Sequence, residues 1–194
     1  MNCPTARRDP RRWPWLIVVA VLIALIVADR NGWLLVRHAD DMATYHGARA
    51  QVVRVIDGDT IEIDIPDPRE DRPVTRLRLW GVDCPELAKP DQPAEPFADE
   101  AAALARSLAH GQVISLRLES HRTRGEYGRL LVHVELPDGS SLNEALLAGG
   151  YAEADDRWPH SLLGRYAQLQ RTARRKALGI WSDTATIAQA NKKD

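Results

Sequence analysis

The sequence predicts a mainly β domain of the α+β class, in which five short strands form a small barrel accompanied by three helices. One observation is strict alternation in short runs: over residues 60–65, three isoleucines alternate with two acidic residues, which is the period of a half-buried strand. The other is a set of longer segments with apolar residues at helical spacing. With 194 residues, the chain has room for one compact domain and an extension.

Five runs predict the strands, at residues 48–55, 60–65, 75–82, 114–118 and 130–136. In the third run, Leu77 and Leu79 lie on one face, and Arg76, Arg78 and Trp80 lie on the other. Because successive side chains of a strand point to opposite faces, Arg78 is turned away from the apolar side and can face a groove.

Three segments predict helices. Residues 98–109 carry an alanine- and leucine-rich stripe and end before Gly111. Ser141 and Glu144 form a capping box for a short helix that extends to residue 148. A last helix begins near residue 162 and closes at Gly179. Five strands with three helices fit a Greek-key barrel of the oligonucleotide-binding (OB) type, although these patterns do not determine the strand order.

Charged residues with the chemistry for phosphodiester cleavage gather in residues 57–60, 77–86 and 127–129. Asp59 and Asp83 offer carboxylates to a hard cation such as Ca²⁺. Glu86 follows Asp83 closely enough to take a proton from a nearby water. Arg78 and Arg129 can grip phosphate oxygens through paired hydrogen bonds. Each residue alone would be interpreted as a surface charge, but their order and spacing favour a catalytic site.

These segments resemble the staphylococcal nuclease (thermonuclease) family over residues 48–181. The shared landmarks are V-I-D-G-D-T at 55–60, R-L-x-x-V-D-x-P-E at 78–86, Y-G-R at 127–129, L-N-E-A-L at 142–146 and G-I-W at 179–181. The resemblance implies an OB-fold nuclease that depends on Ca²⁺, acts on DNA and RNA and leaves 3′-phosphates. We expect it to act as a monomer.

The resemblance also implies a role for individual residues. One Ca²⁺ would be bound by Asp59, Asp83 and the backbone carbonyl of Cys84, which stands where the family usually has Thr. Glu86 would be the base, and Arg78 and Arg129 would hold the scissile phosphate. It further implies Asp57 behind the metal ligands and Tyr127 on a terminal phosphate. Apart from the resemblance, we expect Thr60 behind the metal ligands as well, Arg124 on the substrate because the groove must be locally basic, and Trp158 on the substrate.

The chain also departs from the family pattern. Glu126 stands where the family often has a phosphate-binding Lys. Residues 155–159 replace a stretch in which family members carry tyrosines that stack on a base. Trp158 offers a replacement for that stacking, and the alternative is that it only packs.

Charge and cysteine content limit the classes of function. The first thirty residues hold five arginines and two aspartates, so the remainder has a net charge of −4. This argues against tight non-catalytic DNA binding, which depends on basic patches. Cys3 and Cys84 do not form a disulfide framework, and Cys84 is interpreted as a backbone ligand rather than a nucleophile. The later histidines, His110, His121, His133 and His160, lack zinc-ligand spacing and are interpreted as surface or structural residues.

The N-terminal region predicts an anchor. Residues 1–12 are basic and expected in the cytoplasm, 13–30 are predicted as a transmembrane helix, 31–47 as a linker, 48–183 as the nuclease-like domain and 184–194 as a tail. The apolar run is short for a spanning helix and long for a signal-peptide core. The arginines place the domain outside the cytoplasm, and the alternative is secretion after signal cleavage.

Two other function classes remain at this point. One is a catalytically silent nuclease-like barrel that binds nucleic acid or protein at the membrane surface. The other is a membrane-associated scaffold. A silent copy does not need Asp59, Asp83 and Glu86 together, so their joint presence favours an enzyme.

Overall fold

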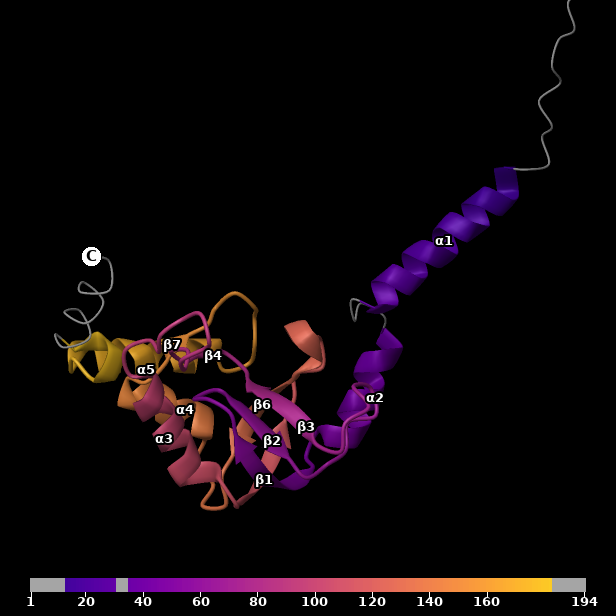
Figure 1. Cartoon of the computed structure of the whole chain (residues 1–194). Coiled ribbons are helices and arrows are strands. Elements are labelled where there is room, and N and C mark those ends of the chain that lie inside the picture. Colours follow the sequence, from indigo (N-terminus) through magenta and orange to yellow (C-terminus); the bar gives the residue numbers. More distant parts are fainter. Residues whose placement is uncertain (1–12, 31–34, 183–194) are drawn as a thin grey trace, which may run out of the picture.

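A five-stranded barrel forms the body of the molecule in the computed structural model, which describes residues 13–30 and 35–182. Its strands are β1 (Arg49–Val55), β2 (Thr60–Ile63), β3 (Thr75–Leu79), β5 (Val113–Arg117) and β6 (Leu130–Glu135). They close in the order β1-β2-β3-β6-β5. β3 and β6 pair in parallel, and the other neighbours pair antiparallel. The closed, mainly β barrel predicted from the sequence is confirmed (Figure 1).

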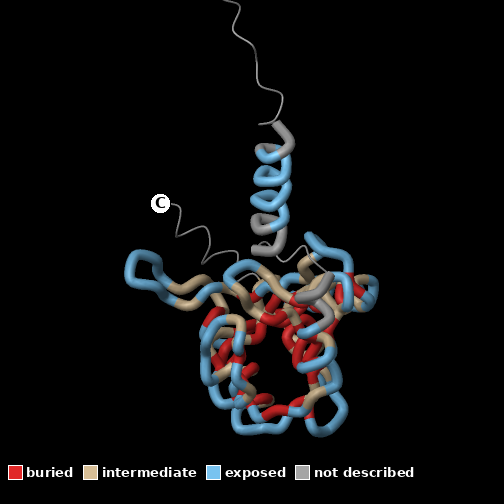
Figure 2. Tube along the Cα trace, turned by 90° about the vertical axis from the view of Figure 1, so that its right-hand side faces the viewer, coloured by how far each residue is buried: buried red, intermediate tan, exposed pale blue. Residues whose placement is uncertain are grey.

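The barrel interior is the hydrophobic core, with buried residues concentrated along the inner wall (Figure 2). The alternation predicted for β3 is confirmed, since Leu77 and Leu79 are buried and Arg76 and Arg78 are partly exposed. Trp80 was expected on the arginine face, and this was wrong: it is 3% exposed. The residue follows the end of β3, where the chain turns at Gly81 with φ +68°, so the period of two no longer holds.

Three helices accompany the barrel as predicted: α3 (Ala98–Ala109), α4 (Leu142–Gly149) and α5 (Leu163–Arg175). The Ser141 hydroxyl caps α4 by accepting a hydrogen bond from the backbone N–H of Glu144. The buried Asn143 joins α4 to the barrel, because its side chain accepts from the Val134 N–H and donates to the Trp80 carbonyl. α5 ends before Gly179, and residues Gly179–Trp181 form a separate 3₁₀ turn.

A small two-stranded sheet was not predicted. β4 (Val82–Asp83) pairs antiparallel with β7 (Glu153–Ala154), which places Asp83 opposite Glu153. Strands of two residues are too short to show alternation, so this pairing had no sequence signal. It joins the segment that carries Asp83 to the chain between α4 and α5.

The linker expected over residues 31–47 was wrong, because it contains helix α2 (Leu35–Tyr45). Tyr45 is 2% exposed and belongs to the core, and Asp41 is also 2% exposed. A sequence signal was present, because Leu35, Ala39, Met42 and Tyr45 stand at helical spacing, and it was overlooked among the charged residues of this short segment.

Helix α1 (Trp13–Arg30) forms at the position of the expected anchor. No helix within the described ranges 13–30 and 35–182 is sufficiently long and apolar to cross a membrane. The basic segment 1–12 and the predicted tail 184–194 lie outside the described residues.

Candidate active site

Asp59 is the most buried of the predicted metal ligands. It lies in the turn between β1 and β2 and is 1% exposed. Its Oδ2 accepts a hydrogen bond from the backbone N–H of Cys84 at 2.8 Å, and its Oδ1 accepts from the Thr60 hydroxyl at 3.1 Å. A Cβ on Gly58 would stand 2.7 Å from the Cys84 sulfur, so glycine lets the two segments approach each other. This contact brings the first two predicted motifs together.

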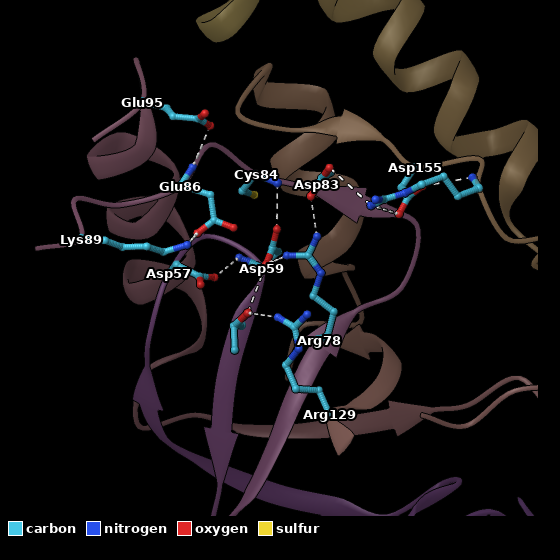
Figure 3. A network of polar contacts seen from close by, with 12 residues as sticks. Asp57, Asp59, Arg78, Asp83, Cys84, Glu86, Lys89, Glu95, Arg129 and Asp155 are labelled. Atoms are coloured by element: carbon cyan, nitrogen blue, oxygen red, sulfur yellow. Dashed lines mark hydrogen bonds and ion pairs between the residues drawn. The ribbon is translucent and has the colours of Figure 1, made fainter. Parts of the chain in front are cut away.

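Arg78 joins the two predicted metal-binding carboxylates. Its guanidinium forms an ion pair with Asp59 and lies 2.5 Å from Asp83 Oδ1 (Figure 3). The Asp83 side chain is half exposed, whereas the Arg78 side chain is 15% exposed. The predicted convergence of these three residues is therefore present in the structure.

The residues present fit a hard divalent cation. Asp59 and Asp83 already share the Arg78 guanidinium as a cationic partner, and carboxylate oxygens are the ligand type that Ca²⁺ and Mg²⁺ prefer. The Cys84 peptide contacts Asp59 directly, so its backbone is near both carboxylates. Binding such a cation would require Arg78 to release at least one carboxylate, which would leave its guanidinium available to a phosphate.

Arg129 lies just before β6, and its guanidinium points toward Thr60 and the region around Arg78 (Figure 3). Its Nη1 is 3.4 Å from the Thr60 hydroxyl. Its Nε is buried and makes no hydrogen bond among the described residues. Burial, followed by the charge of Arg78, lowers the pKa of Arg129, while Asp57 and Glu86 act in the opposite direction. A buried donor without a partner costs free energy, and a phosphate oxygen would satisfy it.

Glu86 lies on the loop after β4, with half of its side chain exposed. Its carboxylate forms an ion pair with Lys89 at 3.1 Å, and its backbone N–H donates to Glu95 at 3.1 Å. Its charge contributes to the pKa of Arg129, so it belongs to the same cluster (Figure 3). The proposed base is therefore accessible to solvent and paired with a lysine that water or substrate can displace.

Asp57 and Thr60 lie behind Asp59, as the resemblance implied. Asp57 Oδ1 accepts from the backbone N–H of Asp59 at 3.0 Å. Burial raises the pKa of Asp57, although hydrogen bonds to Thr60 and the charges of Arg78 and Arg129 oppose this effect. Thr60 is 3% exposed and contacts both Asp59 and Arg129. The two residues hold the backbone and the carboxylate of Asp59 in place.

The predicted substrate residues separate into two groups. Tyr127 is 87% exposed, has φ +61°, and its ring centroid lies 5.9 Å from the Arg129 guanidinium carbon. Trp158 is 49% exposed, and the guanidinium of Arg122 stacks on its ring at 3.8 Å. Both present an aromatic surface to solvent, so both remain open to a substrate.

Arg124 does not belong with them, and the structure places it in a buried ion-pair cluster. Its guanidinium contacts Asp41 at 3.0 Å and Asp67 at 2.5 Å, and it donates to the Gly128 carbonyl at 2.8 Å. Although burial lowers the pKa of Arg124, its hydrogen bonds to the two aspartates raise it above the usual value. These partners use its donors, so the geometry argues against a role in substrate binding and indicates a structural one.

The Cys84 thiol is not arranged as a nucleophile. The residue is 8% exposed, and burial raises the pKa of its thiol well above the usual range. A reactive cysteine needs an accessible thiolate with a lowered pKa. The interpretation of Cys84 as a backbone contributor is consistent with this geometry.

One residue near the site was missed in the sequence. Arg157 lies 3.5 Å from Asp83 and is held by Asp155 at 2.7 Å. Residues 155–159 were considered only as a replacement for base stacking. The opposite charges of Asp155 and Arg157, two residues apart, were a signal for a local ion pair, but nothing in the sequence placed them beside Asp83.

The comparisons with known proteins agree with this geometry. The family model described as "Staphylococcal nuclease homologue" matches residues 76–183. The thermonuclease of Staphylococcus intermedius is 36% identical over 171 residues, covering 86% of this chain and 94% of that protein. The thermonuclease of Staphylococcus hyicus is 34% identical, with 69% and 75% covered. An uncharacterized endonuclease of Escherichia coli is 30% identical, with 75% and 82% covered. The chain therefore belongs to the staphylococcal nuclease family.

Proposed function

We propose that this protein is a metal-dependent nuclease that hydrolyses phosphodiester bonds of DNA and RNA. One observation carries the proposal: Asp59 and Asp83 both pair with the Arg78 guanidinium, and Arg129 and Glu86 lie in the same cluster. Relatives named thermonuclease and endonuclease add support. A barrel that only bound nucleic acid would not need the carboxylates of Asp59 and Asp83 close to Arg129, whose Nε has no hydrogen-bond partner among the described residues.

The proposed cation is one Ca²⁺, held by Asp59, Asp83 and the backbone carbonyl of Cys84. Oxygen ligands with two full charges suit Ca²⁺, and they also suit Mg²⁺ or Mn²⁺. When bound there, a divalent cation would polarise a phosphate oxygen and lower the pKa of a water.

The protein residues would supply the remaining chemistry. Glu86 would accept the proton of the attacking water at its carboxylate, after exchanging Lys89 for that water. The water oxygen would bond to phosphorus and the bond from phosphorus to O5′ would break, leaving a 3′-phosphate and a 5′-oxygen that takes a proton from solvent water to become a hydroxyl. Arg78 and Arg129 would donate hydrogen bonds to the phosphate oxygens as their negative charge grows. Tyr127 and Trp158 are the exposed aromatic residues available to bind flanking nucleotides.

Glu86→Gln tests the proposed base. General-base contributions are about 10²–10⁴-fold, so turnover on DNA and RNA should fall within that range, while Ca²⁺ affinity and substrate affinity stay near those of the wild type. Glu135→Gln, which changes an exposed glutamate at the end of β6, is the matched control and should keep full activity. Unchanged turnover of Glu86→Gln would remove this residue from the mechanism. No cleavage by the wild-type protein with any divalent metal would favour the silent, binding-only barrel.

We also propose that the nuclease domain acts outside the cytoplasm. The support is the basic cluster at residues 7–12, which precedes an apolar run, as in membrane-targeting segments. In cells that express the full-length protein, external protease should digest the domain on intact spheroplasts if the protein stays attached to the membrane. If it is secreted after cleavage, periplasmic extracts should contain the domain. A domain found only in the cytosol would contradict this location.

A further inference from the structure

Three side chains outside the candidate active site converge where residues 155–162 pack on the barrel. Glu119 follows β5, His133 lies on β6, and His160 precedes α5. One ligand atom from each of them lies within 4.8 Å of those of the other two. His133 and His160 are 4% and 9% exposed. The earlier interpretation of these histidines rested on their spacing in the sequence, which cannot reveal a site assembled from three distant segments.

Neighbouring residues orient two members of this cluster. The Tyr166 hydroxyl lies 2.8 Å from His133 Nδ1, and Glu119 lies 3.2 Å from His133 Nε2. Ser161 donates to Glu119 through its backbone N–H at 2.9 Å and its hydroxyl at 2.5 Å. Metal-binding histidines and carboxylates are characteristically fixed by such hydrogen bonds. Tyr166 and Ser161 therefore pre-position a nitrogen and an oxygen ligand.

His160 supplies the observation that points to a ligand. Its Nε2 is fully buried and has no hydrogen-bond partner within the described part of the chain. Its Nδ1 accepts a 3.2 Å hydrogen bond from the Leu162 N–H, so the neutral ring carries its proton on Nε2. Because a neutral imidazole has one lone pair, ligation through Nε2 would move that proton to Nδ1 and replace the Leu162 hydrogen bond. A Cβ at Gly81 would stand 2.4 Å from Nε2, so a glycine is needed for the ring to occupy this position. A buried polar atom without a partner is costly.

The chemistry of the set fits a transition metal better than an alkaline-earth ion. Two imidazoles and one carboxylate are a common zinc ligand set, with water in the fourth position, whereas Ca²⁺ and Mg²⁺ prefer oxygen ligands alone. Burial lowers the pKa of both histidines, that of His133 to about 4, which favours the neutral imidazole that binds metals. Ligands of a tetrahedral zinc lie about 3.3 Å apart, which small side-chain rotations can reach from the observed cluster.

We propose that Glu119, His133 and His160 form a second metal site, which takes Zn²⁺ or a similar transition-metal ion and is separate from the nuclease site. His160 belongs to residues 155–162. This segment also carries Arg157, which contacts Asp83, and Trp158, which faces solvent. A metal at this site would hold that segment against the barrel and stabilise the fold.

Metal binding by the untagged full-length protein tests the proposal. Asp83→Ala provides a background in which the nuclease site contributes little. We expect equilibrium dialysis to find one Zn²⁺ per chain, Co²⁺ to give the visible absorption of a tetrahedral site, and Zn²⁺ to raise the melting temperature. In the same background, His160→Gln and Glu119→Gln should each weaken Zn²⁺ binding by about 100-fold or more, because a ligand is lost. His121→Gln, which changes an exposed histidine, should bind as its parent does.

Two results would overturn the proposal. One is the absence of saturable Zn²⁺ uptake by the folded parent protein, which would identify a metal-free hydrogen-bonded cluster. The other is unchanged uptake in His160→Gln, or an equal loss in His121→Gln. If the cluster variants do not fold, the test uses the folded parent protein instead. X-ray absorption of its bound Zn²⁺ should then show two imidazole neighbours, and their absence would overturn the proposal. Because the readout is binding and not cleavage, the outcome is independent of the nuclease proposal.

Discussion

The two arginines of the candidate site differ in how fully their donors are used. Arg78 is paired with both Asp59 and Asp83. Arg129 has one long contact to Thr60 and a buried Nε without a partner in the described residues. An arginine with unused donors is prepared for a ligand that the protein does not itself supply. Arg129 is therefore the residue whose role depends most directly on the phosphate.

Arg129→Lys should lower turnover by roughly 10²-fold or more, by analogy with the removal of one preorganised transition-state donor. A lysine retains the charge but cannot reproduce the planar pair of hydrogen bonds. Single-turnover cleavage of a short DNA measures the loss. Arg54→Lys, on an exposed side chain of β1, is the control and should behave as the wild type. Full turnover of Arg129→Lys would show that Arg129 does not contact the reacting phosphate.

Cys84 provides a second test at this scale. Because its thiol is buried and its pKa is raised, Cys84 in a Cys3→Ser background should react with a thiol reagent far more slowly in the folded protein than in the denatured protein. Cys84→Thr should retain most of the nuclease activity, because the backbone N–H to Asp59 and the carbonyl remain. Modification is followed by the absorbance of the coloured thiolate that the reagent releases, and activity is followed by cleavage of DNA. Rapid modification with loss of activity in the native state would indicate a functional thiol.

The sequence predicted most site residues because motifs specify local order. Asp59, Asp83 and Arg78 were expected together and are together. Arg124 was predicted as a substrate residue because a groove that binds nucleic acid must be locally basic. Its partners Asp41 and Asp67 are distant in the sequence and are themselves buried, so no local pattern announced the pairing. The Glu119, His133 and His160 cluster was missed for the same reason.

At the scale of elements, helix α2 is part of the domain and not a linker. Asp41 on α2 receives hydrogen bonds from Thr123 at 2.7 Å and from Arg124. Arg124 in turn reaches the carbonyl of Gly128, next to Arg129. The helix therefore supports the loop that carries Tyr127 and Arg129. The boundary predicted at residue 48 falls after an element that the domain needs.

Arg124→Met should destabilise the fold by about 3–5 kcal/mol, since removing one partner of a buried ion pair leaves uncompensated charge. Here Asp67 would lose its ion-pair partner, and Asp41 would keep its ion pair with Arg69 at 3.0 Å. Urea denaturation measures the free energy of unfolding. Arg106→Met, at an exposed position of α3, is the comparison and should change it by less than about 1 kcal/mol. A similarly small change for Arg124→Met would mean that the cluster adds little to stability.

The elements also show how far periodicity reaches. Strands of four to seven residues and helices with apolar stripes were predicted within a few residues of their bounds. β4 and β7, with two residues each, were not, because period two cannot be recognised in two residues. α2 was missed although its apolar residues stand at helical spacing, because the stripe is short and is interrupted by charged residues such as Asp40 and Asp41.

At the scale of the whole molecule, the barrel brings segments separated by about seventy residues to one end. Thr60 after the first turn and Arg129 before β6 contact each other there, and the parallel pairing of β3 with β6 places Arg78 opposite Leu131. Alternation predicts strands but not their neighbours, so this order came from the family resemblance. The active-site proposal depends on that topology as much as on its residues.

If this end of the barrel cuts nucleic acid with a cation held by Asp59 and Asp83, cleavage must depend on that cation and on Asp83. Cleavage of DNA and RNA by the full-length protein is followed during a titration with Ca²⁺, in the wild type and in Asp83→Ala, with the exposed turn variant Asp138→Ala as control. Chelation should abolish cleavage, Ca²⁺ should restore it in the wild type and in Asp138→Ala, and Asp83→Ala should stay nearly inactive with weakened Ca²⁺ binding. Cleavage that persists in chelator, or an Asp83→Ala protein with wild-type activity and Ca²⁺ affinity, would contradict this dependence.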